Sequence, residues 1–478
     1  MFAGLPLARP DDAALRAAAR AQRAAAGPLL GVLDDDPTGS QAVHGIEVVT
    51  APDPAAYEAA LDGGPGGACF VLTNTRSLAG PDAAALTAAV ARDLIAAAAQ
   101  RGQRIQLISR SDSTLRGHLL AEVTAIQRAR RDVLGRGFDG VLLIPAFPEA
   151  GRVTAGGIHW ARIGPDLIPV GETEFARDPA FSYRSSALAG FIAERSGGAV
   201  QPGQVTSIGL ADIRRGGPDR VAGLLAGVPS GGWVAVDSTE YSDLDVVASG
   251  VLRAERSGQA FLFRTGPSFV RALLGQDPQP SLRGARIWPA GQRGRDGGHG
   301  LIVVGSHVGH TSRQLAALRA RPGVTAIELD VPAVLRGDDD VAALTARQAA
   351  AALPESDVLL YTSRAVATGR DAAGSLAIAR TVSAALAGTV RDVLAARRPG
   401  WVLAKGGITS HDVATRGLGI RRALVAGQLF PGVISVFHPV DADPAAASLP
   451  YVVFAGNVGD DGTLAQVVDI LNGGQEDS

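Results

Sequence analysis

The stretch GVLDDDPTGS, from Gly31 to Ser40, is the most informative part of this chain about its fold and its candidate site. An apolar run, Leu29–Leu33, predicts a buried β-strand, and three consecutive aspartates, Asp34 to Asp36, follow it before a Pro-Thr-Gly turn. In open α/β sheets, ligands bind at the carboxyl ends of the strands. Three carboxylates at such an end indicate a metal ion, a polyol or a proton to be removed, whereas the structural alternative is a solvated acidic turn.

Outward from this stretch, apolar runs alternate with Ala-rich segments. Further strands are expected within 68–77, 105–117 and 140–152, and helices over 81–100 and 118–135 between them. This βαβ alternation predicts an α/β protein made of two Rossmann-like three-layer α/β/α domains with mostly parallel sheets.

The length of 478 residues exceeds one ordinary core and predicts two or three domains. A segment rich in Pro, Gly and Arg, without periodicity, separates two blocks of strands and predicts a linker. The expected organisation is an N-terminal helical extension over 1–27, a first domain over 28–274, a linker over 275–300, a second domain over 301–472 and a tail over 473–478.

Composition excludes several classes of protein. Hydrophobic residues make up 46% and charged residues 19%, which is typical of a globular, soluble chain. The formal net charge of −2 gives no reason to expect nucleic acid or an anionic membrane as partner. No apolar run approaches the roughly 18 residues of a membrane-spanning helix, and no secretion signal is recognised. The single cysteine, Cys69, excludes an internal disulfide and fits a cytoplasmic location.

Polar clusters follow four strands of the first block. If these strands are parallel neighbours, their loops converge on one edge and line a pocket with carboxylates and arginines, which suits a small, hydroxylated anion. Arg76 or Arg116 could clamp a carboxylate, while Asp35, Asp36 or Asp112 accepts hydroxyl protons. The alternative for each residue is an ion pair that orders its loop.

The second block presents glycines and hydroxyls instead, in VVGSHVGHTS, AKGGITSHD and FAGNVG. Glycines after strands let backbone N–H groups approach phosphates, so three such loops predict a nucleotide cradle. Neither a Walker A pattern nor GxGxxG occurs. Lys405 is the single lysine among 45 Lys and Arg residues. Either this lysine is retained by chance, or its site requires an ammonium group that a guanidinium group cannot replace.

With these motifs in order, the chain resembles the four-carbon acid sugar kinase family over about residues 28–472. The resemblance rests on short motifs distributed over both blocks: DD-x-TG at Asp35–Gly39, TRS at Thr75–Ser77, DSTLRG at Asp112–Gly117, PAFPEAGR at Pro145–Arg152, GS at Gly305 and Ser306, GGIT at Gly406–Thr409, and GN-G from Gly456 to Gly459.

Members of that family phosphorylate small sugar acids, such as threonate, erythronate and 3-oxo-tetronate, at the terminal hydroxyl with ATP. The resemblance implies an acid-sugar-binding first domain and a nucleotide-binding second domain. It implies acid contacts from Asp36, Arg76, Ser109, Arg110, Ser111 and Asp112, and ATP contacts from Ser306, Gly406, Gly407, Ile408, Thr409, Gly456 and Asn457. Many members have two lysines where this chain has Ser109 and Arg110, so the particular acid stays open.

The resulting hypothesis places the active site in the cleft between two domains that close on each other. Asp35 or Asp36 acts as the base, and Lys405 or Arg116 stabilises charge. Mg²⁺ is expected to be held largely by ATP oxygens and water, with its protein ligands unassigned. A homodimer is left open.

Two other functions compete with this one. LLGVLDDDPT also fits the DxDxT signature of haloacid-dehalogenase-like phosphatases, with Asp34 as nucleophile and Asp36 as acid/base. That interpretation needs an implausibly large insertion and leaves the second block without a role. The third candidate is a two-lobed, non-catalytic sensor of sugar acids.

Overall fold

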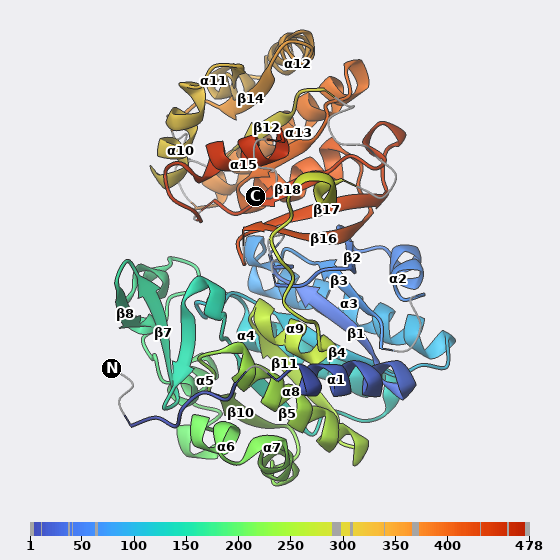
Figure 1. Ribbon diagram of the computed structural model, residues 1–478, viewed down its shortest axis with the longest axis vertical. Helices are drawn as coiled ribbons and strands as arrows, with labels where there is room; N and C mark the ends of the chain where they lie inside the picture. Colours follow the sequence, from blue (N-terminus) through green and yellow to red (C-terminus); the bar gives the residue numbers. More distant parts are fainter. Residues whose placement is uncertain are drawn as a thin grey trace. The chain divides into compact units, whose positions relative to one another are not determined.

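The computed structural model divides into two compact units, Met1–Pro278 (unit 1) and Gln279–Ser478 (unit 2). Each unit is a β-sheet with helices on its faces (Figure 1). The residues that the structure describes are 4–10, 12–36, 39–40, 42–62, 66–288, 298–305, 309–338, 340–365, 372–430, 432–456 and 458–473.

The sheet of unit 1 has the strand order β2-β3-β1-β4-β11-β5-β10-β9, with neighbours parallel. Its strands are β1 (Leu29–Asp34), β2 (Ile46–Val49), β3 (Ala68–Leu72), β4 (Ile105–Arg110), β5 (Gly140–Ile144), β9 (Thr206–Ile208), β10 (Gly232–Val236) and β11 (Phe261–Thr265). All six residues of β1 are buried, as the apolar run predicted for Leu29–Leu33, and the burial includes Asp34. Because β1 pairs with β3 and β4, the predicted loops do leave the same edge of the sheet.

Helices cover both faces of this sheet, which confirms the three-layer expectation for unit 1. They are α1 (Ala13–Ala26), α2 (Pro54–Ala60), α3 (Gly80–Gln100), α4 (Leu119–Leu134), α5 (Leu188–Arg195), α6 (Leu210–Arg214), α7 (Gly217–Ala226), α8 (Tyr241–Arg256) and α9 (Pro267–Leu274). The helices predicted over 81–100 and 118–135 are α3 and α4. In α4, Leu119, Val123 and Ile126 recur at helical spacing and are buried in the same core as Leu107 of β4.

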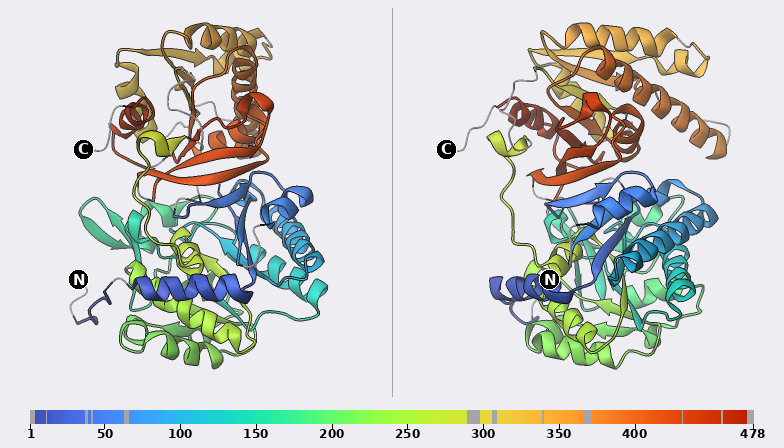
Figure 2. Two further views of the ribbon diagram at one scale, coloured as in Figure 1. Left: turned by 45° about the vertical axis from the view of Figure 1, so that its right-hand side comes forward. Right: turned by 90° about the vertical axis from the view of Figure 1, so that its right-hand side faces the viewer.

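The N-terminal helix is an integral part of unit 1. Asp12 caps α1 by accepting a hydrogen bond from the Leu15 N–H at 3.2 Å. The helix packs against α8 and α9, on the opposite side of the sheet from α3 (Figure 2). Arg16 is buried and pairs with Asp245 at 3.1 Å and Asp277 at 2.8 Å. Buried arginines of this kind are not expected of a purely surface helix.

A small antiparallel sheet of β6 (Arg152–Ala155), β7 (Ile158–Ile163) and β8 (Asp166–Pro169) was not anticipated. Its first turn places Gly156 and Gly157 at φ +62° and +72°, the left-handed conformations that tight hairpins require. The Asp237 carboxylate fixes this turn by accepting hydrogen bonds from both glycine N–H groups at 2.9 Å.

Unit 2 has the strand order β13-β14-β12-β15-β18-β17-β16, in which β17 runs antiparallel to its neighbours β18 and β16 and the other neighbouring pairs are parallel. The strands are β12 (Leu301–Val304), β13 (Val324–Leu329), β14 (Asp357–Thr362), β15 (Val402–Lys405), β16 (Arg422–Phe430), β17 (Ile434–Asp441) and β18 (Tyr451–Phe454). The helices are α10 (Gly309–Arg319), α11 (Val331–Leu335), α12 (Asp340–Ala352), α13 (Ala372–Ala396), α14 (Gly407–Asp412) and α15 (Thr463–Leu471). The sheet is mostly parallel, as predicted, and β16 is an additional strand.

The segment predicted as a linker is structured where it is described. Leu282 and Ile287 are buried in the core of unit 2, and the Leu282 N–H donates to the Gln428 carbonyl at 2.7 Å. Residues 289–297 lie outside the described residues. The division between the units falls within the predicted linker, and the finer domain boundaries stay a prediction.

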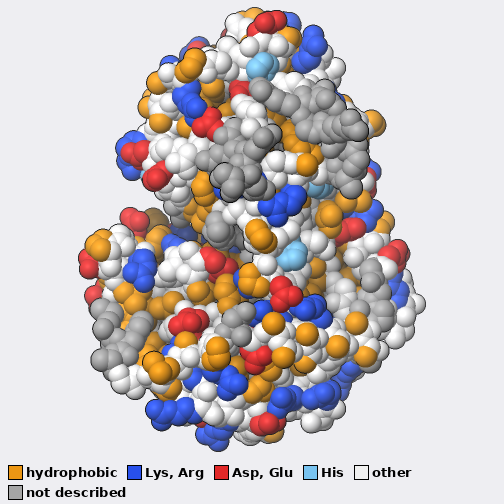
Figure 3. Space-filling model, viewed as in Figure 1, with side chains coloured by type: hydrophobic (Ala, Val, Ile, Leu, Met, Phe, Trp, Pro, Cys, Tyr) orange, Lys and Arg blue, Asp and Glu red, His pale blue; other side chains and the backbone are white. Residues whose placement is uncertain are grey.

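Acidic and basic side chains are interspersed on the face of the molecule that Figure 3 shows. This mixture accords with the formal net charge of −2. No helix among the described residues combines the length and the apolar character needed to cross a membrane.

Candidate active site

The carboxyl edge of the unit 1 sheet carries a dense network of ionised side chains. Strand β1 ends at Asp34 and is followed by Asp35 and Asp36, while Arg76 follows β3 and Asp112 follows β4. Since β3, β1 and β4 are neighbours, these side chains lie close together. The predicted convergence is therefore present in the structure.

Asp34 is the structural member of the aspartate triplet. It is 0% exposed, and its Oδ1 accepts from Arg110 Nη1 at 2.8 Å and from the Asp36 N–H at 3.2 Å. A Cβ atom at Gly39 would lie 1.9 Å from Asp34 Oδ2, so the turn closes tightly over this carboxylate. Burial raises the pKa of Asp34 to about 7, against the opposing effect of Arg110. Asp34 thus holds the turn and has no surface to offer a ligand.

Asp35 is the centre of the network. Only 1% of it is exposed, and Ser111 Oγ donates to its Oδ2 at 2.7 Å. Arg76 Nε lies 3.2 Å from Asp35 Oδ1, and Arg264 Nη2 lies 3.9 Å from Oδ2. Burial raises the pKa of Asp35, and the surrounding guanidinium groups oppose the increase. Asp35, which follows β1, therefore contacts side chains at the ends of β3, β4 and β11.

Two ion pairs at the rim are partly exposed. Arg76 Nη2 lies 2.5 Å from Asp36 Oδ2, with side chains 18% and 23% exposed. Arg116 Nε lies 2.6 Å from Asp112 Oδ2, with side chains 24% and 13% exposed. Although burial opposes ionisation, Arg116 and Arg76 hold the pKa of Asp112 well below its usual range. A ligand can therefore reach both ion pairs, and Arg116 Nη1 also lies 3.5 Å from Asp178 Oδ2, on a side chain that is 25% exposed.

Two buried charges were missed by the sequence analysis. Glu122 of α4 accepts from Thr75 Oγ1 at 2.6 Å and from Ser109 Oγ at 3.2 Å, and it pairs with Arg264 of β11. Arg264 Nη1 also donates to Ser109 Oγ at 2.6 Å. The available signal for Arg264 was a charged residue inside the apolar strand FLFRT.

Ser109 and Arg110, predicted to contact the acid, are both buried in this structure. Ser109 faces Glu122 and Arg110 faces Asp34, so both support the walls of the site. Their contact with a ligand stays a prediction.

The small antiparallel sheet supports the Asp112–Gly117 loop through a hydrogen bond from His159 to the Ser113 carbonyl. Leu115 has φ +67°, a conformation that a leucine rarely adopts and that its surroundings must maintain. Burial lowers the pKa of His159 to about 4, so its ring is neutral near pH 7. Thr154 Oγ1 lies 2.9 Å from Nδ1, and the Ser113 carbonyl accepts from Nε2 at 2.7 Å. Tyr183 donates its hydroxyl to the Thr114 carbonyl at 2.5 Å.

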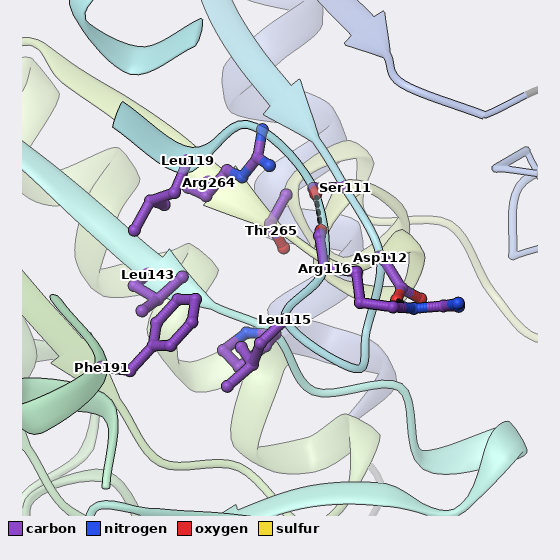
Figure 4. A pocket seen from close by; sticks show the side chains of 10 residues that line it. Ser111, Asp112, Leu115, Arg116, Leu119, Leu143, Phe191, Arg264 and Thr265 are labelled. Carbon is purple, nitrogen blue, oxygen red and sulfur yellow. Dashed lines mark hydrogen bonds and ion pairs between the residues drawn. The ribbon is translucent and has the colours of Figure 1, made fainter. Parts of the chain in front are cut away.

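A pocket opens beside this loop (Figure 4). Polar and apolar side chains both line it: Ser111, Asp112, Arg116, Arg264 and Thr265 are polar, and Leu115, Leu119, Leu143, Pro145 and Phe191 are apolar. Figure 4 shows Arg116 alongside Asp112, and Ser111 Oγ donating to the Arg116 carbonyl at 3.2 Å.

At the corresponding edge of unit 2, the three predicted glycine loops come together. Strands β12, β15 and β18 are neighbours, with Val304, Lys405 and Phe454 in register. Gly305 and Thr409 approach so closely that a Cβ at Gly305 would lie 2.3 Å from Thr409 Oγ1.

The backbone of these loops suits close approach to a ligand. Gly406 has φ +114°, Gly407 begins α14, and Ile408 is 49% exposed. Thr311 Oγ1 donates to the Gly456 carbonyl at 2.9 Å. Ser306 and Asn457 lie outside the described residues.

Lys405 lies fully buried at the end of β15. Its Nζ donates to the Ala455 carbonyl at 3.1 Å and lies 3.7 Å from the centroid of the Phe454 ring. No carboxylate among the described residues pairs with it. Burial lowers the pKa of Lys405 to about 7. An approaching anion would therefore favour the protonated form of Lys405, which has no carboxylate partner within the described chain.

Among the described residues there is no group of three or more His, Cys, Asp or Glu side chains placed to hold a metal ion. A dedicated protein cage for Mg²⁺ is thus absent from that part of the chain. Mg²⁺ often keeps several waters and binds through substrate phosphates with only one or two carboxylates.

Comparison with known proteins yields matches over both units. Residues 30–273 match the model of a sugar-binding N-terminal domain, and residues 301–464 match that of a nucleotide-binding C-terminal domain. A D-erythronate kinase from Heliobacterium modesticaldum is 30% identical over 267 residues, covering 55% of this chain and 53% of the relative. The chain therefore spans about half the length of that relative.

A D-threonate kinase from Bordetella bronchiseptica is 29% identical over 477 residues, covering 93% of this chain and 98% of the relative. The crystal structure of a Haemophilus influenzae protein superposes with a TM-score of 0.60 at 18% identity, covering 91% of this chain and 99% of that one. This last likeness shows that the fold is shared.

Proposed function

This chain belongs to the four-carbon acid sugar kinase family, and on that premise we propose that it transfers the γ-phosphoryl group of ATP to the terminal hydroxyl of a small sugar acid. The observation that supports this most is the pair of contrasting strand edges. One presents carboxylates and guanidinium groups within reach of a ligand, and the other presents glycine loops beside a buried lysine.

The accessible groups of unit 1 match the chemistry of a sugar acid. A guanidinium group binds a carboxylate through two parallel hydrogen bonds, and Arg76 and Arg116 are both partly exposed. A carboxylate can accept the proton of an attacking hydroxyl, and Asp36 is the exposed member of the triplet. We assign Asp36 as the base, Asp35 as the residue that positions Arg76 and Ser111, and Asp112 as a partner for hydroxyl groups.

The edge of unit 2 matches the chemistry of nucleotide phosphates. Gly407 and Thr409 would present backbone N–H groups to phosphate oxygens, with Ile408 and Gly456 completing the wall. The Gly406 N–H donates to the Phe454 carbonyl at 2.8 Å, so Gly406 would contribute close backbone approach and no free donor. Ser306 and Asn457 stay predicted ATP ligands. Lys405 would neutralise charge on the transferred group, and Arg116 would do the same from the acceptor side.

Phosphoryl transfer depends mainly on positioning and on charge neutralisation. The proposal requires a nucleotide held by unit 2 to reach an acceptor held by unit 1. Mg²⁺ would arrive with the ATP phosphates, whose charge it neutralises. The chain's own part is to bind and orient the acid through Arg76 or Arg116 and to take up the hydroxyl proton at Asp36.

The phosphatase alternative finds little support. Its nucleophile would be Asp34, which is 0% exposed and engaged by Arg110 and by the Asp36 N–H. Family membership also assigns the second unit a nucleotide, for which a phosphatase has no use. The sensor alternative differs from the kinase in one observable respect, since a sensor binds an acid without consuming ATP.

A coupled assay of ADP release tests the proposal. The purified chain is given MgATP and, separately, D-threonate, D-erythronate and their L-isomers. We expect ADP release that depends on one or more of these acids. Absence of acid-dependent release from folded protein that still binds ADP would overturn the proposal, and acid binding without release would favour the sensor.

A further inference from the structure

Unit 1 contains a second cavity, at the opposite edge of its sheet from the aspartate triplet. The cavity has a volume of about 380 Å³ and is lined by Pro28 before β1, Ile105 at the start of β4 and Phe261 at the start of β11. A strand rises about 3.3 Å per residue, so the six-residue strand β1 separates the two edges by roughly 20 Å. The cavity is therefore distinct from the candidate active site, and its size is within the range of small-ligand pockets.

Guanidinium groups give this cavity a positive lining. Arg104, Arg130 and Arg136 all border it, opposed by the single carboxylate of Glu255. Arg130 is buried, lies 4.5 Å from the centroid of the Phe138 ring, and donates from Nε to the Gly137 carbonyl at 3.2 Å. With three guanidinium groups and one carboxylate, the lining residues carry a net positive charge that would attract an anionic ligand.

Two residues that line the cavity carry polar atoms that the described residues do not satisfy. Gln103 Oε1 and Glu255 Oε2 are buried without a hydrogen-bond partner among the described residues. Gln106 Nε2 engages the other oxygen of Glu255, which leaves Oε2 available. Burial raises the pKa of Glu255 to about 7, so near neutral pH this oxygen can accept from a hydroxyl or, when protonated, donate. Unpaired buried oxygens are costly, and ligand hydroxyl groups would satisfy them.

From the positive lining and the unsatisfied oxygens together, we infer that this cavity is a second binding site for a small, polyhydroxylated anion. The arginines would bind its carboxylate or phosphate, and Gln103 and Glu255 would bind its hydroxyl groups. Sugar acids and their phosphate esters share this chemistry. They are also the acceptor and the product of the proposed reaction, so the choice of probe rests on the proposed function.

Calorimetric titration of the full chain with D-threonate and with D-threonate 4-phosphate, without nucleotide, tests the inference. We expect two sites per chain for at least one of the two probes. Replacing both Arg104 and Arg136 by Gln should weaken one site by about tenfold or more and leave the other unchanged. Arg130 is left intact because it packs on Phe138. The control is Arg128→Gln, on α4 near Arg130 but outside the cavity lining, which should retain both sites.

The variant Arg76→Gln separates the two sites, because it should lose the active-site isotherm and keep the second. Inorganic phosphate, which carries charge but no carbon-bound hydroxyl groups, should bind the second site more weakly than the better probe. Equal affinity would contradict the roles of Gln103 and Glu255. A single site in the native chain, or a second site indifferent to the double substitution, would overturn the inference. A second site that persists while no acid supports ADP release would refute the proposed function alone.

Discussion

The carboxyl edges of the two sheets differ in the groups they present. The edge of unit 1 is built from charged side chains, and the edge of unit 2 mainly from backbone. In unit 1, Asp35 and Arg76 connect three strand ends through side chains, and the ligand is expected to exchange with these ion pairs. In unit 2, glycine backbone and one buried lysine form the edge. Under the proposed function, the choice of acid would depend on individual side chains, whereas nucleotide binding would depend on backbone geometry. Substitutions should therefore affect acid and nucleotide separately.

The largest effect is expected for Asp36→Asn. If Asp36 takes the hydroxyl proton, its loss should reduce kcat/KM for the acid by about 10²- to 10⁴-fold while the affinity for ADP stays unchanged. Steady-state kinetics and calorimetry measure the two quantities.

The matched control for this substitution is Asp34→Asn, whose amide oxygen can still accept from Arg110 and from the Asp36 N–H. That variant should keep most of the activity. The reverse result, an inactive Asp34→Asn and an active Asp36→Asn, would revive the phosphatase interpretation.

A pH effect on stability is expected from Lys405. Burial lowers its pKa from 10.5 to about 7, so between these pH values the unfolded chain carries a proton that the folded chain does not. The free energy of unfolding should therefore contain a contribution that is full above pH 10.5 and is lost as the pH falls toward 7, on the order of 5 kcal/mol.

Urea unfolding of the native chain and of Lys405→Met at pH 7 and pH 9 isolates this contribution. The stability of the native chain relative to the variant should increase with pH. If the difference in the free energy of unfolding between the native chain and the variant is the same at both pH values, Lys405 is charged in the folded state. Bound nucleotide should stabilise the charged form and so reduce the dependence of this difference on pH.

A smaller effect is expected for Arg76→Lys. Lysine keeps the charge but cannot reach Asp35 and Asp36 with two nitrogens as Arg76 does. The KM for the acid should rise about tenfold, and the KM for ATP should not change. Arg116→Lys is the parallel substitution. Whichever of the two arginines binds the carboxylate of the acid should give the greater increase in the KM for the acid when it is replaced by lysine. Equal increases in both KM values for Arg76→Lys would contradict the separation of the two edges.

The smallest effect is expected for His159, which supports the Asp112–Gly117 loop without facing the ligand. His159→Leu removes the hydrogen bond to the Ser113 carbonyl, so the KM for the acid should rise by about threefold to tenfold with little change in kcat. His159→Gln can still donate to that carbonyl and should recover part of the loss. A reduction in kcat without a change in KM would contradict a positioning role.

Much of unit 1 could be predicted from the sequence because periodicity and burial agree there. The apolar run of β1 and the spacing of Leu119, Val123 and Ile126 in α4 determine the elements, and βαβ order brings their loops together. The hairpin strands β6 to β8 were missed because they are short and only partly buried.

The separate roles of the three aspartates could not be predicted from sequence. Nothing in DDD tells which carboxylate turns inward, since that depends on Gly39 closing over Asp34 and on Arg110 arriving from β4. The ion pair between Glu122 and Arg264 could not be predicted for a similar reason. A buried ion pair between a helix and a strand becomes visible only when the two are packed together.

Phosphorus NMR of the reaction product tests the central claim most directly. The chain is incubated with MgATP and the acid that supports the fastest ADP release. The account predicts one new phosphomonoester resonance whose phosphorus couples to the two protons of a terminal CH₂ group, growing in step with ADP. Growth of inorganic phosphate alone, with no new ester, would contradict it.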